Sequence, residues 1–383
     1  MRVTRIIALV LCLANVAFAQ SETSYSKGLP KSPEFFPVAV WLQTPTNAKR
    51  YQAIGINLYV GLWNGPTEAQ LNALDQAGMP VICAQNEIGL KFLDRRTIVG
   101  WMHGDEPDNA QLLGNGKGYG PPVAPQKIVE SYEQIRMNDP DRPVFLNLGQ
   151  GVAWDNWPGR GVRTNHPEDY AEYVKGCDIA SFDIYPASHE KKEVAGKLWY
   201  VPKGVERLRR WSEGKKDVWT CIETTRISNA EVKPTPQQVR SEVWMALIQG
   251  AKGIIYFAHE FKPKFIEAGL LADQDMAKEV TDINRQIKEL APVLNQPNVT
   301  EAVTVASSRS DIPVIFMTKQ HEGKTYLFVA SMREGETTVR FKMPGTNNFK
   351  VNVFHENRSI AAVEGKWSDE FKNYQTHIYV IEK

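Results

Sequence analysis

The chain is short of the residue types that build metal centres and disulfide frameworks. It has four cysteines and seven histidines among 383 residues, and no CxxC or HxxxH spacing. Four cysteines are too few for a disulfide-built fold of this length. We therefore expect no metal site, and a metal-dependent hydrolase, which needs histidine clusters, is the least favoured class of enzyme.

An excess of charge of one sign is also missing. The chain has 45 basic and 44 acidic residues, which leaves a net charge of +1. No basic stripe is present to attract nucleic acid or anionic lipid through bulk electrostatics. No apolar run opens into a GxGxxG or GxxxxGK phosphate loop, so we expect no cofactor. The expected partner is a small or neutral molecule.

Long hydrophobic runs are absent apart from a short one near the start. Arg2 and Arg5 precede an apolar run from Ile6 to Leu13, and Ala17-Phe18-Ala19 forms a small-x-small cleavage site. The run is shorter than the ~20 residues that a membrane-spanning helix needs, and this arrangement is typical of a signal peptide. We expect a signal peptide over residues 1–19 and a secreted or periplasmic protein without membrane attachment after cleavage.

Three cysteines remain in the predicted mature chain. Cys83, Cys177 and Cys221 all lie in or beside apolar, strand-like runs. Cysteine in such surroundings is most often a buried free thiol. The sequence therefore favours free thiols over disulfide bonds.

Short apolar runs set the organisation of the first 260 residues, and most of them are separated by a helix-period segment. Near-continuous apolar runs are typical of parallel strands buried on both faces. The runs are Phe36 to Leu42, Ile56 to Leu62, Pro80 to Ala84, Ile98 to His103, Val144 to Leu148, Ile179 to Tyr185, Val218 to Glu223, and Gly253 to Ala258.

Helical periodicity appears between most of these runs. The predicted helices are Asn47 to Ile54, Glu68 to Gln76, Pro125 to Met137, Pro167 to Val174, Val205 to Trp211, and Pro236 to Gln249. Eight such strand–helix units in about 260 residues match the size of a closed (β/α)8 TIM barrel. The fold class is therefore α/β, with an open doubly wound sheet as the second choice.

The sequence pattern changes after a long predicted helix from Gln274 to Leu294. Short alternating strands follow, with hairpin turns such as His321-Glu322-Gly323-Lys324, as in an antiparallel sandwich. The predicted strands are Val314 to Thr318, Tyr326 to Ala330, Thr337 to Phe341, Lys350 to Phe354, and Thr376 to Ile381. We expect a barrel domain over residues 20–296 and a small β-sandwich over 297–383.

In a barrel of this kind the chemistry sits at the carboxyl ends of the strands. The polar residues and tryptophans that end the apolar runs are therefore the candidates for a site. They are Trp41, Gln43, Trp63, Asn64, Gln85 to Glu87, His103 to Glu106, Asn147 to Gln150, Asp183, Tyr185, Glu223, His259 and Glu260.

Two of these candidates, Glu106 and Glu223, follow buried runs without a charged partner nearby in the sequence. Glycosidic cleavage needs two carboxyl groups on either side of one bond, one to deliver a proton and one to attack or to activate water. Predicted strands four and seven supply such a pair across the barrel mouth. We expect Glu106 and Glu223 to be the catalytic residues.

Several further residues are predicted to bind substrate, on weaker grounds. Aromatic faces stack on sugar rings, and polar side chains at strand ends bind hydroxyl groups. Trp154 lies in a Gly- and Asn-containing loop after the fifth predicted strand, where substrate sites are often built. The predicted substrate-binding residues are Asp105, Tyr185, Trp41, Trp63, Asn147, Trp154, His103 and Glu260.

The strand-end residues resemble those of the clan A retaining glycoside hydrolases. In that group the acid/base ends strand four, commonly between Asn and Pro, and here Asp105-Glu106-Pro107 keeps the Glu-Pro. The resemblance implies Glu106 as acid/base, Glu223 as nucleophile at the end of strand seven, and Tyr185 as the tyrosine that orients the nucleophile. It also implies a carbohydrate substrate, and an appended β-sandwich is frequent in the group.

The replacement of that Asn by Asp105 leaves a second mechanism open. In the clan the Asn typically binds the sugar 2-hydroxyl, and an Asp still accepts that hydrogen bond. An adjacent Asp-Glu pair is also similar to the pair of substrate-assisted N-acetylhexosaminidases, in which Asp steadies the acetamido group of the substrate and Glu is the acid/base. Neighbouring carboxylates raise one another's pKa, which suits Glu106 as an acid.

A third possibility is a carbohydrate-binding barrel that has lost catalysis, since a fold does not guarantee activity. Binding alone would not require two carboxylates in these particular units, which favours an enzyme. For an enzyme, carboxyl groups about 5 to 5.5 Å apart predict retention, and about 6.5 to 9.5 Å predict inversion.

Overall fold

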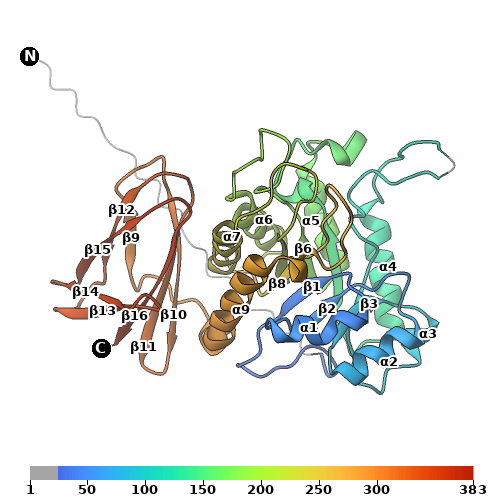
Figure 1. Ribbon diagram of the computed structural model, residues 1–383, viewed down its shortest axis with the longest axis horizontal. Coiled ribbons are helices and arrows are strands. Elements are labelled where there is room, and N and C mark those ends of the chain that lie inside the picture. Colours follow the sequence, from blue (N-terminus) through green and yellow to red (C-terminus); the bar gives the residue numbers. More distant parts are fainter. Residues whose placement is uncertain (1–24, 115, 383) are drawn as a thin grey trace, which may run out of the picture.

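The computed structural model describes residues 25–114 and 116–382. The predicted signal peptide over residues 1–19 lies outside the described residues. Two lobes are visible, a barrel formed by the N-terminal and central parts of the chain and a β-sandwich formed by the C-terminal part (Figure 1). No helix among the described residues is long and apolar enough to cross a membrane.

The larger lobe is a closed barrel of eight parallel strands, as the sequence predicts. Each strand pairs with the next along the chain, and β8 closes the barrel against β1, with Val38 opposite Ile254. The strands are β1 (Val38–Trp41), β2 (Leu58–Val60), β3 (Val81–Ala84), β4 (Ile98–Met102), β5 (Val144–Leu148), β6 (Ile179–Phe182), β7 (Asp217–Glu223) and β8 (Gly253–Phe257).

Both faces of the strands are buried, which explains their continuous apolar character. Ala39, Phe145 and Trp219 belong to the cluster that fills the barrel, while Val40 and Leu146 belong to the larger cluster beneath the helices. Side chains alternate between these two clusters because successive residues of a strand point to opposite faces. The same alternation decides which polar residues at the strand ends can face the barrel axis.

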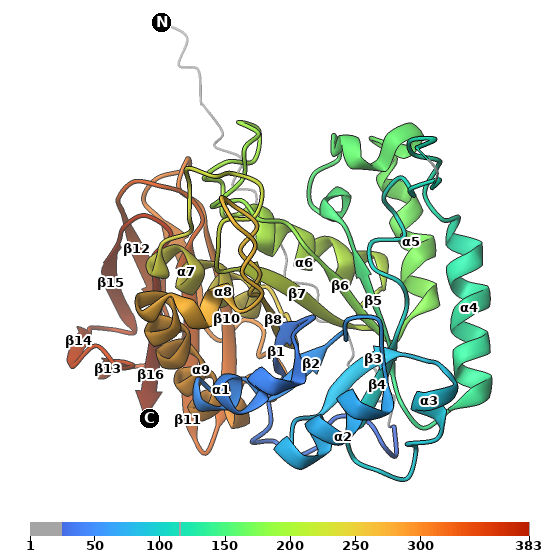
Figure 2. The same ribbon diagram turned by 45° about the vertical axis from the view of Figure 1, so that its right-hand side comes forward.

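Helices connect the strands around the outside (Figure 2). They are α1 (Ala48–Ala53), α2 (Glu68–Ala77), α3 (Glu87–Leu90), α4 (Pro125–Asn138), α5 (Tyr170–Tyr173), α6 (Tyr200–Trp211), α7 (Pro236–Ile248), α8 (Gly269–Ala272) and α9 (Gln274–Leu294). Capping boxes at Thr67 and Thr235 start α2 and α7, since each threonine accepts a hydrogen bond from an otherwise unpaired backbone N–H.

Most predicted helices are confirmed, with differences at their ends. α6 begins at Tyr200, five residues before the predicted start, because Tyr200, Val201 and Pro202 are buried against the barrel. α5 is a single turn flanked by 3-10 turns. α3 and α8, of four residues each, were not predicted, since such short segments carry too few turns to show a helical period.

The smaller lobe is a sandwich of two antiparallel sheets. One has the order β10-β11-β16-β13-β14 and the other β15-β12-β9. Its strands are β9 (Thr304–Ser307), β10 (Val314–His321), β11 (Lys324–Ser331), β12 (Thr337–Lys342), β13 (Phe349–Val353), β14 (Arg358–Ala362), β15 (Lys366–Phe371) and β16 (Thr376–Glu382). In the predicted β10–β11 hairpin, Glu322 and Gly323 both have positive φ, as a two-residue turn of this kind requires.

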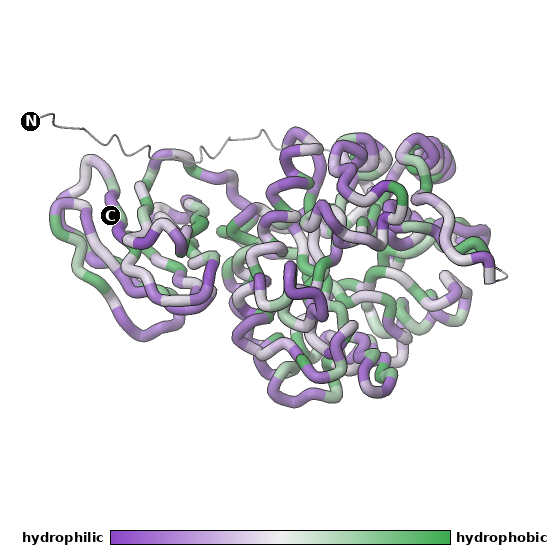
Figure 3. Tube along the Cα trace, turned by 90° about the horizontal axis from the view of Figure 1, so that it is seen from above, coloured by the Kyte–Doolittle hydropathy of each residue, from purple (hydrophilic) through white to green (hydrophobic). Residues whose placement is uncertain are grey.

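Three sandwich strands, β9, β14 and β15, were missed by the sequence reasoning. Each exposes several of its residues, so the apolar signal is weak. The sandwich packs on the barrel through β11 and α7, where the rings of Phe328 and Trp244 stack with centroids 6.1 Å apart. Figure 3 shows the hydrophilic segments mostly around the outside of both lobes.

Cys83, Cys177 and Cys221 are buried and free, which agrees with the expectation of free thiols. Cys83 and Cys177 pack among the residues of the large cluster beneath the helices, and Cys221 lies inside the barrel. Burial raises the pKa of the Cys177 thiol to about 12. These thiols stay protonated at neutral pH and act as small apolar side chains.

Candidate active site

Carboxyl and amide side chains meet where β4, β5 and β6 end. Asn147 on β5 donates from Nδ2 to Oδ1 of Asp105, over 3.0 Å. Tyr185 lies just beyond β6 and is buried, with its ring 5.1 Å from that of Phe257 on β8. The hydroxyl of Tyr185 is hydrogen-bonded to Asp183. The structure thus brings together Glu106, Asp105, Asn147 and Tyr185 of the predicted residues.

Glu106 sits in a turn that holds its side chain in place. Its φ is +42°, a left-handed conformation that costs free energy for a residue other than glycine. Its N–H donates to the backbone oxygen of Asn147 over 3.2 Å. Asn109 donates from Nδ2 to Oε2 of Glu106 over 2.8 Å. The two bonds fix the carboxyl group against the end of β5.

A glycine lets Glu106 approach the loop after β5. A Cβ atom at Gly149 would lie 2.9 Å from Oε1 of Glu106 and equally close to Asn109. The N–H of Gly149 donates to Oδ1 of Asp108 over 2.8 Å, and the hydroxyl of Tyr170 donates to Oδ2 over 2.7 Å. Asp108 is fully buried, and its hydrogen bonds connect the loop after β4 to the loop after β5.

Asp183, just beyond β6, forms a hydrogen-bonded carboxyl pair with Glu106. Burial, the charge of Asp183 and the hydrogen bond to it raise the pKa of Glu106 well above its ordinary value. Burial raises the pKa of Asp183 to about 7. Because two carboxylates at hydrogen-bonding distance repel each other, the pair holds one proton between them. The hydrogen bond between them raises the pKa of Glu106 and lowers that of Asp183, so it favours the proton on Glu106.

Asp105 differs from Glu106 in its access to solvent. It is exposed, whereas Glu106 is half-buried and Asp183 is buried. Partial burial of its carboxyl group raises the pKa of Asp105, and the hydrogen bond from Asn147 works against that rise. Asp105 is the most exposed residue of the cluster.

Glu223 ends β7 as predicted, but its hydrogen-bond partners lie outside the Glu106 cluster, in the loop after β6 and on α7. Its two oxygens accept hydrogen bonds from the backbone N–H groups of Ala187 and Ser188, over 2.6 and 2.8 Å. It is fully buried, as is Glu242 on α7, to which it is hydrogen-bonded. Burial raises the pKa of Glu223 to about 7 and that of Glu242 well above its ordinary value.

Three other predicted residues are buried. Trp41 is buried inside the barrel against Phe145. His103 is buried between β4 and the outer helices, where Nε2 lies 2.8 Å from the oxygen of Gly176, and burial lowers its pKa. Trp154 is only 7% exposed. These side chains pack within the protein and present little surface to a ligand.

The remaining two predicted residues lie near the end of β8. Trp63 is 41% exposed and donates from Nε1 to Glu267 over 3.0 Å. Glu260 pairs with Arg226 at 3.6 Å. Phe261 and Phe265 in the same loop are also exposed, so this side of the mouth is aromatic while the β4–β6 side is acidic.

The sequence indicates the positions of the site residues better than it indicates their partners. Asp183 was among the strand-end candidates, but nothing in the sequence pairs it with Glu106, 77 positions away. Asn109 and Glu242 gave no signal, since one lies in a loop and the other on a helix. Among residues 25–114 and 116–382, no group of three or more His, Cys, Asp or Glu side chains is arranged to hold a metal ion.

No protein-family model matches the chain, and no curated protein sequence is significantly similar to it. Solved structures are similar in fold. An alpha-amylase from Anoxybacillus has a TM-score of 0.54 at 9% identity, covering 92% of this chain and 99% of its own. A maltogenic alpha-amylase from Thermotoga neapolitana has a TM-score of 0.53 at 9% identity, covering 92% and 99%.

A further solved structure, a Bacteroides fragilis protein assigned provisionally as an alpha-galactosidase, has a TM-score of 0.56 at 9% identity. It covers 91% of this chain and 80% of its own. At such identities the likeness concerns the fold. The chain therefore shares its TIM barrel and C-terminal β-domain with glycosidases of known structure.

Proposed function

We propose that the chain is a glycoside hydrolase whose proton donor is Glu106. The observation that carries the proposal is the Glu106–Asp183 pair, which holds a proton on a half-buried carboxyl group at the carboxyl ends of the strands. A general acid needs a pKa near or above the working pH, so that the proton is present when the leaving oxygen arrives. The fold shared with glycosidases supports the same class of reaction.

A retaining double displacement with Glu223 as nucleophile is one mechanism for this enzyme. Glu106 would give its proton to the leaving oxygen while Glu223 attacks the anomeric carbon, and Glu106 would then take a proton from the water that releases the sugar. In the structure both oxygens of Glu223 accept backbone N–H groups and neither is exposed. This mechanism requires the segment at Ala187 and Ser188 to move before Glu223 can attack.

A substrate-assisted mechanism needs no such movement, and the geometry favours it. The acetamido oxygen of a 2-acetamido sugar would attack the anomeric carbon as Glu106 protonates the leaving oxygen. Asp105, which is exposed and oriented by Asn147, would accept the acetamido N–H and stabilise the cyclic cation. Water would then open the ring, losing its proton to Glu106. Glu223 has a different role here, since its two hydrogen bonds hold the β6 loop.

The test compares aryl glycosides that differ only in having a 2-acetamido or a 2-hydroxyl group. They are assayed with the wild type and with Glu106→Gln, Asp105→Asn and Glu223→Gln, after circular dichroism shows that each variant is folded. Glu172→Gln, an exposed change on α5, is the matched control. A wider panel of oligo- and polysaccharides follows for any group that is cleaved.

Cleavage of the 2-acetamido glycosides alone, lost in Glu106→Gln and Asp105→Asn but kept in Glu223→Gln, is the expected result. Cleavage of 2-hydroxyl glycosides that depends on Glu106 and Glu223 would establish the double displacement instead. A folded wild type that binds glycans but cleaves none would make the chain a carbohydrate-binding barrel.

We also propose that the enzyme is exported. The support is the charged start, apolar run and Ala17-Phe18-Ala19 site of the N-terminal sequence. Expression of the full chain in a bacterial host and N-terminal sequencing of the protein outside the cytoplasm should find Gln20 as the first residue. Retention of Met1 in cytoplasmic protein would overturn the proposal.

A further inference from the structure

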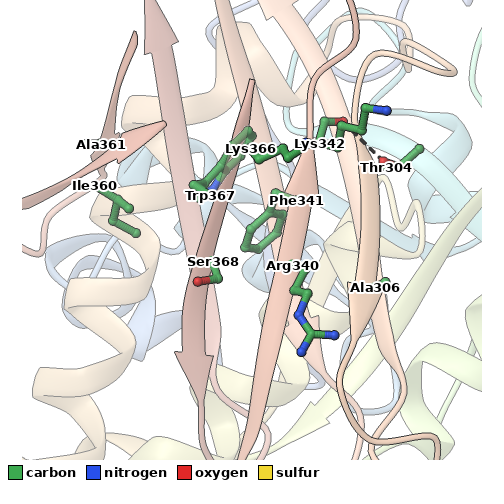
Figure 4. A pocket seen from close by; sticks show the side chains of 10 residues that line it. All are labelled: Thr304, Ala306, Arg340, Phe341, Lys342, Ile360, Ala361, Lys366, Trp367 and Ser368. Carbon is green, nitrogen blue, oxygen red and sulfur yellow. Dashed lines mark hydrogen bonds between the residues drawn. The ribbon is translucent and has the colours of Figure 1, made fainter. Parts of the chain in front are cut away.

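A shallow pocket of about 560 Å³ lies on the three-stranded sheet of the sandwich (Figure 4). Charged and hydroxyl side chains from three neighbouring strands line it, with two residues of β14 at one side. They are Thr304 on β9, Arg340 and Lys342 on β12, and Lys366 and Ser368 on β15. This pocket lies in the other lobe from the carboxyl cluster at the barrel mouth.

The pocket gathers positive charge on one sheet face. Lys342 and Lys366 are directly opposite each other across β12 and β15, and both are exposed, as is Arg340 two residues away. Like charges in directly opposed positions of a sheet are unfavourable. The cost falls when an anion lies between them, so this arrangement is typical of a surface that binds negative charge.

Few carboxylates are available to neutralise these cations. Glu364 lies 4.0 Å from Nζ of Lys366. Glu370, further along β15, accepts a hydrogen bond from the hydroxyl of Thr338. Among the described residues, no ion pair within 4.0 Å is made by Arg340 or Lys342. Two of the three cations are thus available to an outside anion.

Neutral donors complete the pocket. Ser368 lies opposite Arg340, and Thr304 lies opposite Lys342, where its hydroxyl donates to the Lys342 backbone oxygen over 3.3 Å. The lining therefore adds hydroxyl groups to the three cations.

We propose that this face binds an acidic polysaccharide through the carboxylate or sulfate groups of its sugars. An open sheet face can accommodate an extended chain, and three cations with adjacent hydroxyl groups complement a polymer that alternates anionic groups with hydroxyls. The choice of a sugar polymer over other polyanions rests on the proposed function of the attached barrel. This face would hold the enzyme on its polymer, and the barrel would catalyse the cleavage.

The experiment is affinity gel electrophoresis of the full chain in gels containing one polymer each. Polygalacturonate supplies carboxylates, and its fully methyl-esterified form supplies the same backbone without charge. Chondroitin sulfate adds sulfate groups, and duplex DNA is the polyanion without the sugar hydroxyl pattern. Retardation is measured at low and at physiological salt, since ion pairs at a surface are screened by salt.

The test variant replaces Arg340, Lys342 and Lys366 by Gln. Its matched control replaces three exposed lysines of the barrel lobe, Lys127, Lys215 and Lys278, by Gln, which removes the same charge. A Lys342→Arg, Lys366→Arg variant keeps the charge at the pocket. Thermal unfolding checks that all variants are folded.

Wild-type chain should be retarded by polygalacturonate or chondroitin sulfate and not by the methyl ester. Loss of three surface ion pairs should weaken that binding about tenfold in the Gln variant, while the control and the Arg variant bind as wild type. Whichever acidic polymer binds more tightly identifies carboxylate or sulfate as the group recognised.

Absence of retardation by both, equal retardation by DNA, or unchanged binding in the Gln variant would overturn the proposal. Cleavage of aryl glycosides is read separately, so its failure would not be confused with failure of this site.

Discussion

Two carboxyl pairs in this barrel have the same chemistry and different surroundings. Glu106 and Asp183 meet at the barrel mouth, and Glu223 and Glu242 meet between β7 and α7. Each pair holds a shared proton because burial and repulsion disfavour two charges. Glu106 keeps part of its surface exposed, whereas Glu223 and Glu242 are fully buried. Access to solvent therefore separates a pair that can exchange a proton with substrate from one that supports a loop.

Of the changes to the two pairs, replacement of Glu106 should have the largest effect on activity. Glu106→Gln removes the proposed proton donor while keeping the shape and the hydrogen bond with Asn109. Loss of a general acid typically lowers the rate by about 10²- to 10⁴-fold. Steady-state kinetics on the best aryl glycoside measures the loss in kcat. Activity within a factor of about 3 of wild type is smaller than any general-acid effect and would remove Glu106 from the mechanism.

Glu223→Gln should act on stability. The NH2 group of the new amide cannot accept a hydrogen bond, so one of the backbone N–H groups of Ala187 and Ser188 loses its acceptor. An unsatisfied buried donor costs about 1 to 3 kcal/mol. Urea unfolding at pH 6 measures the change in the free energy of unfolding. Unchanged stability together with a fall in kcat as large as in Glu106→Gln would contradict this difference between the two pairs. It would identify Glu223 as the nucleophile.

Asp183→Asn should shift the pH dependence of catalysis. The charge of Asp183 and its hydrogen bond raise the pKa of Glu106, so their removal lowers that pKa. The proton is then lost at lower pH, and the alkaline limb of the kcat/KM profile moves to lower pH. A shift of one unit means about tenfold less activity on that limb. Asp311→Asn, at an exposed site in the sandwich, is the control, and an unmoved alkaline limb would contradict the paired-proton model.

The buried pair should make the protein less stable as pH rises. Burial raises the pKa of Glu223 from 4.5 to about 7, so the folded state binds more protons than the unfolded state in this interval. The free energy of unfolding therefore falls as pH rises from about 4.5 to about 7. Glu242→Gln keeps a donor for the hydrogen bond that lowers the pKa of Glu223, but it removes a carboxyl group whose own pKa burial raises well above its ordinary value, so the fall becomes smaller. Thermal melting between pH 4.5 and 8 measures both slopes, and identical slopes would show that Glu242 does not take part in this titration.

The sequence carried enough information for the barrel because its signals are local. Continuous apolar runs such as Val144 to Leu148 mark strands buried on two faces, and the capping box at Thr235 marks where α7 begins. The strand-end rule likewise selected Glu106, Asp105, Asn147 and Tyr185. These inferences need only residue type and spacing along the chain.

Side-chain partners depended on the tertiary structure. Asp183 and Glu242 are 77 and 19 positions from Glu106 and Glu223 respectively, and only closure of the barrel and packing of α7 bring them into contact. The direction of a side chain at a strand end also depends on the turn that follows, as the positive φ of Glu106 illustrates. The sequence by itself determined the architecture and the position of the candidate carboxylates at the barrel mouth. The tertiary structure decided which carboxyl groups share protons and which remain accessible, because desolvation and hydrogen bonding arise only when distant segments pack together.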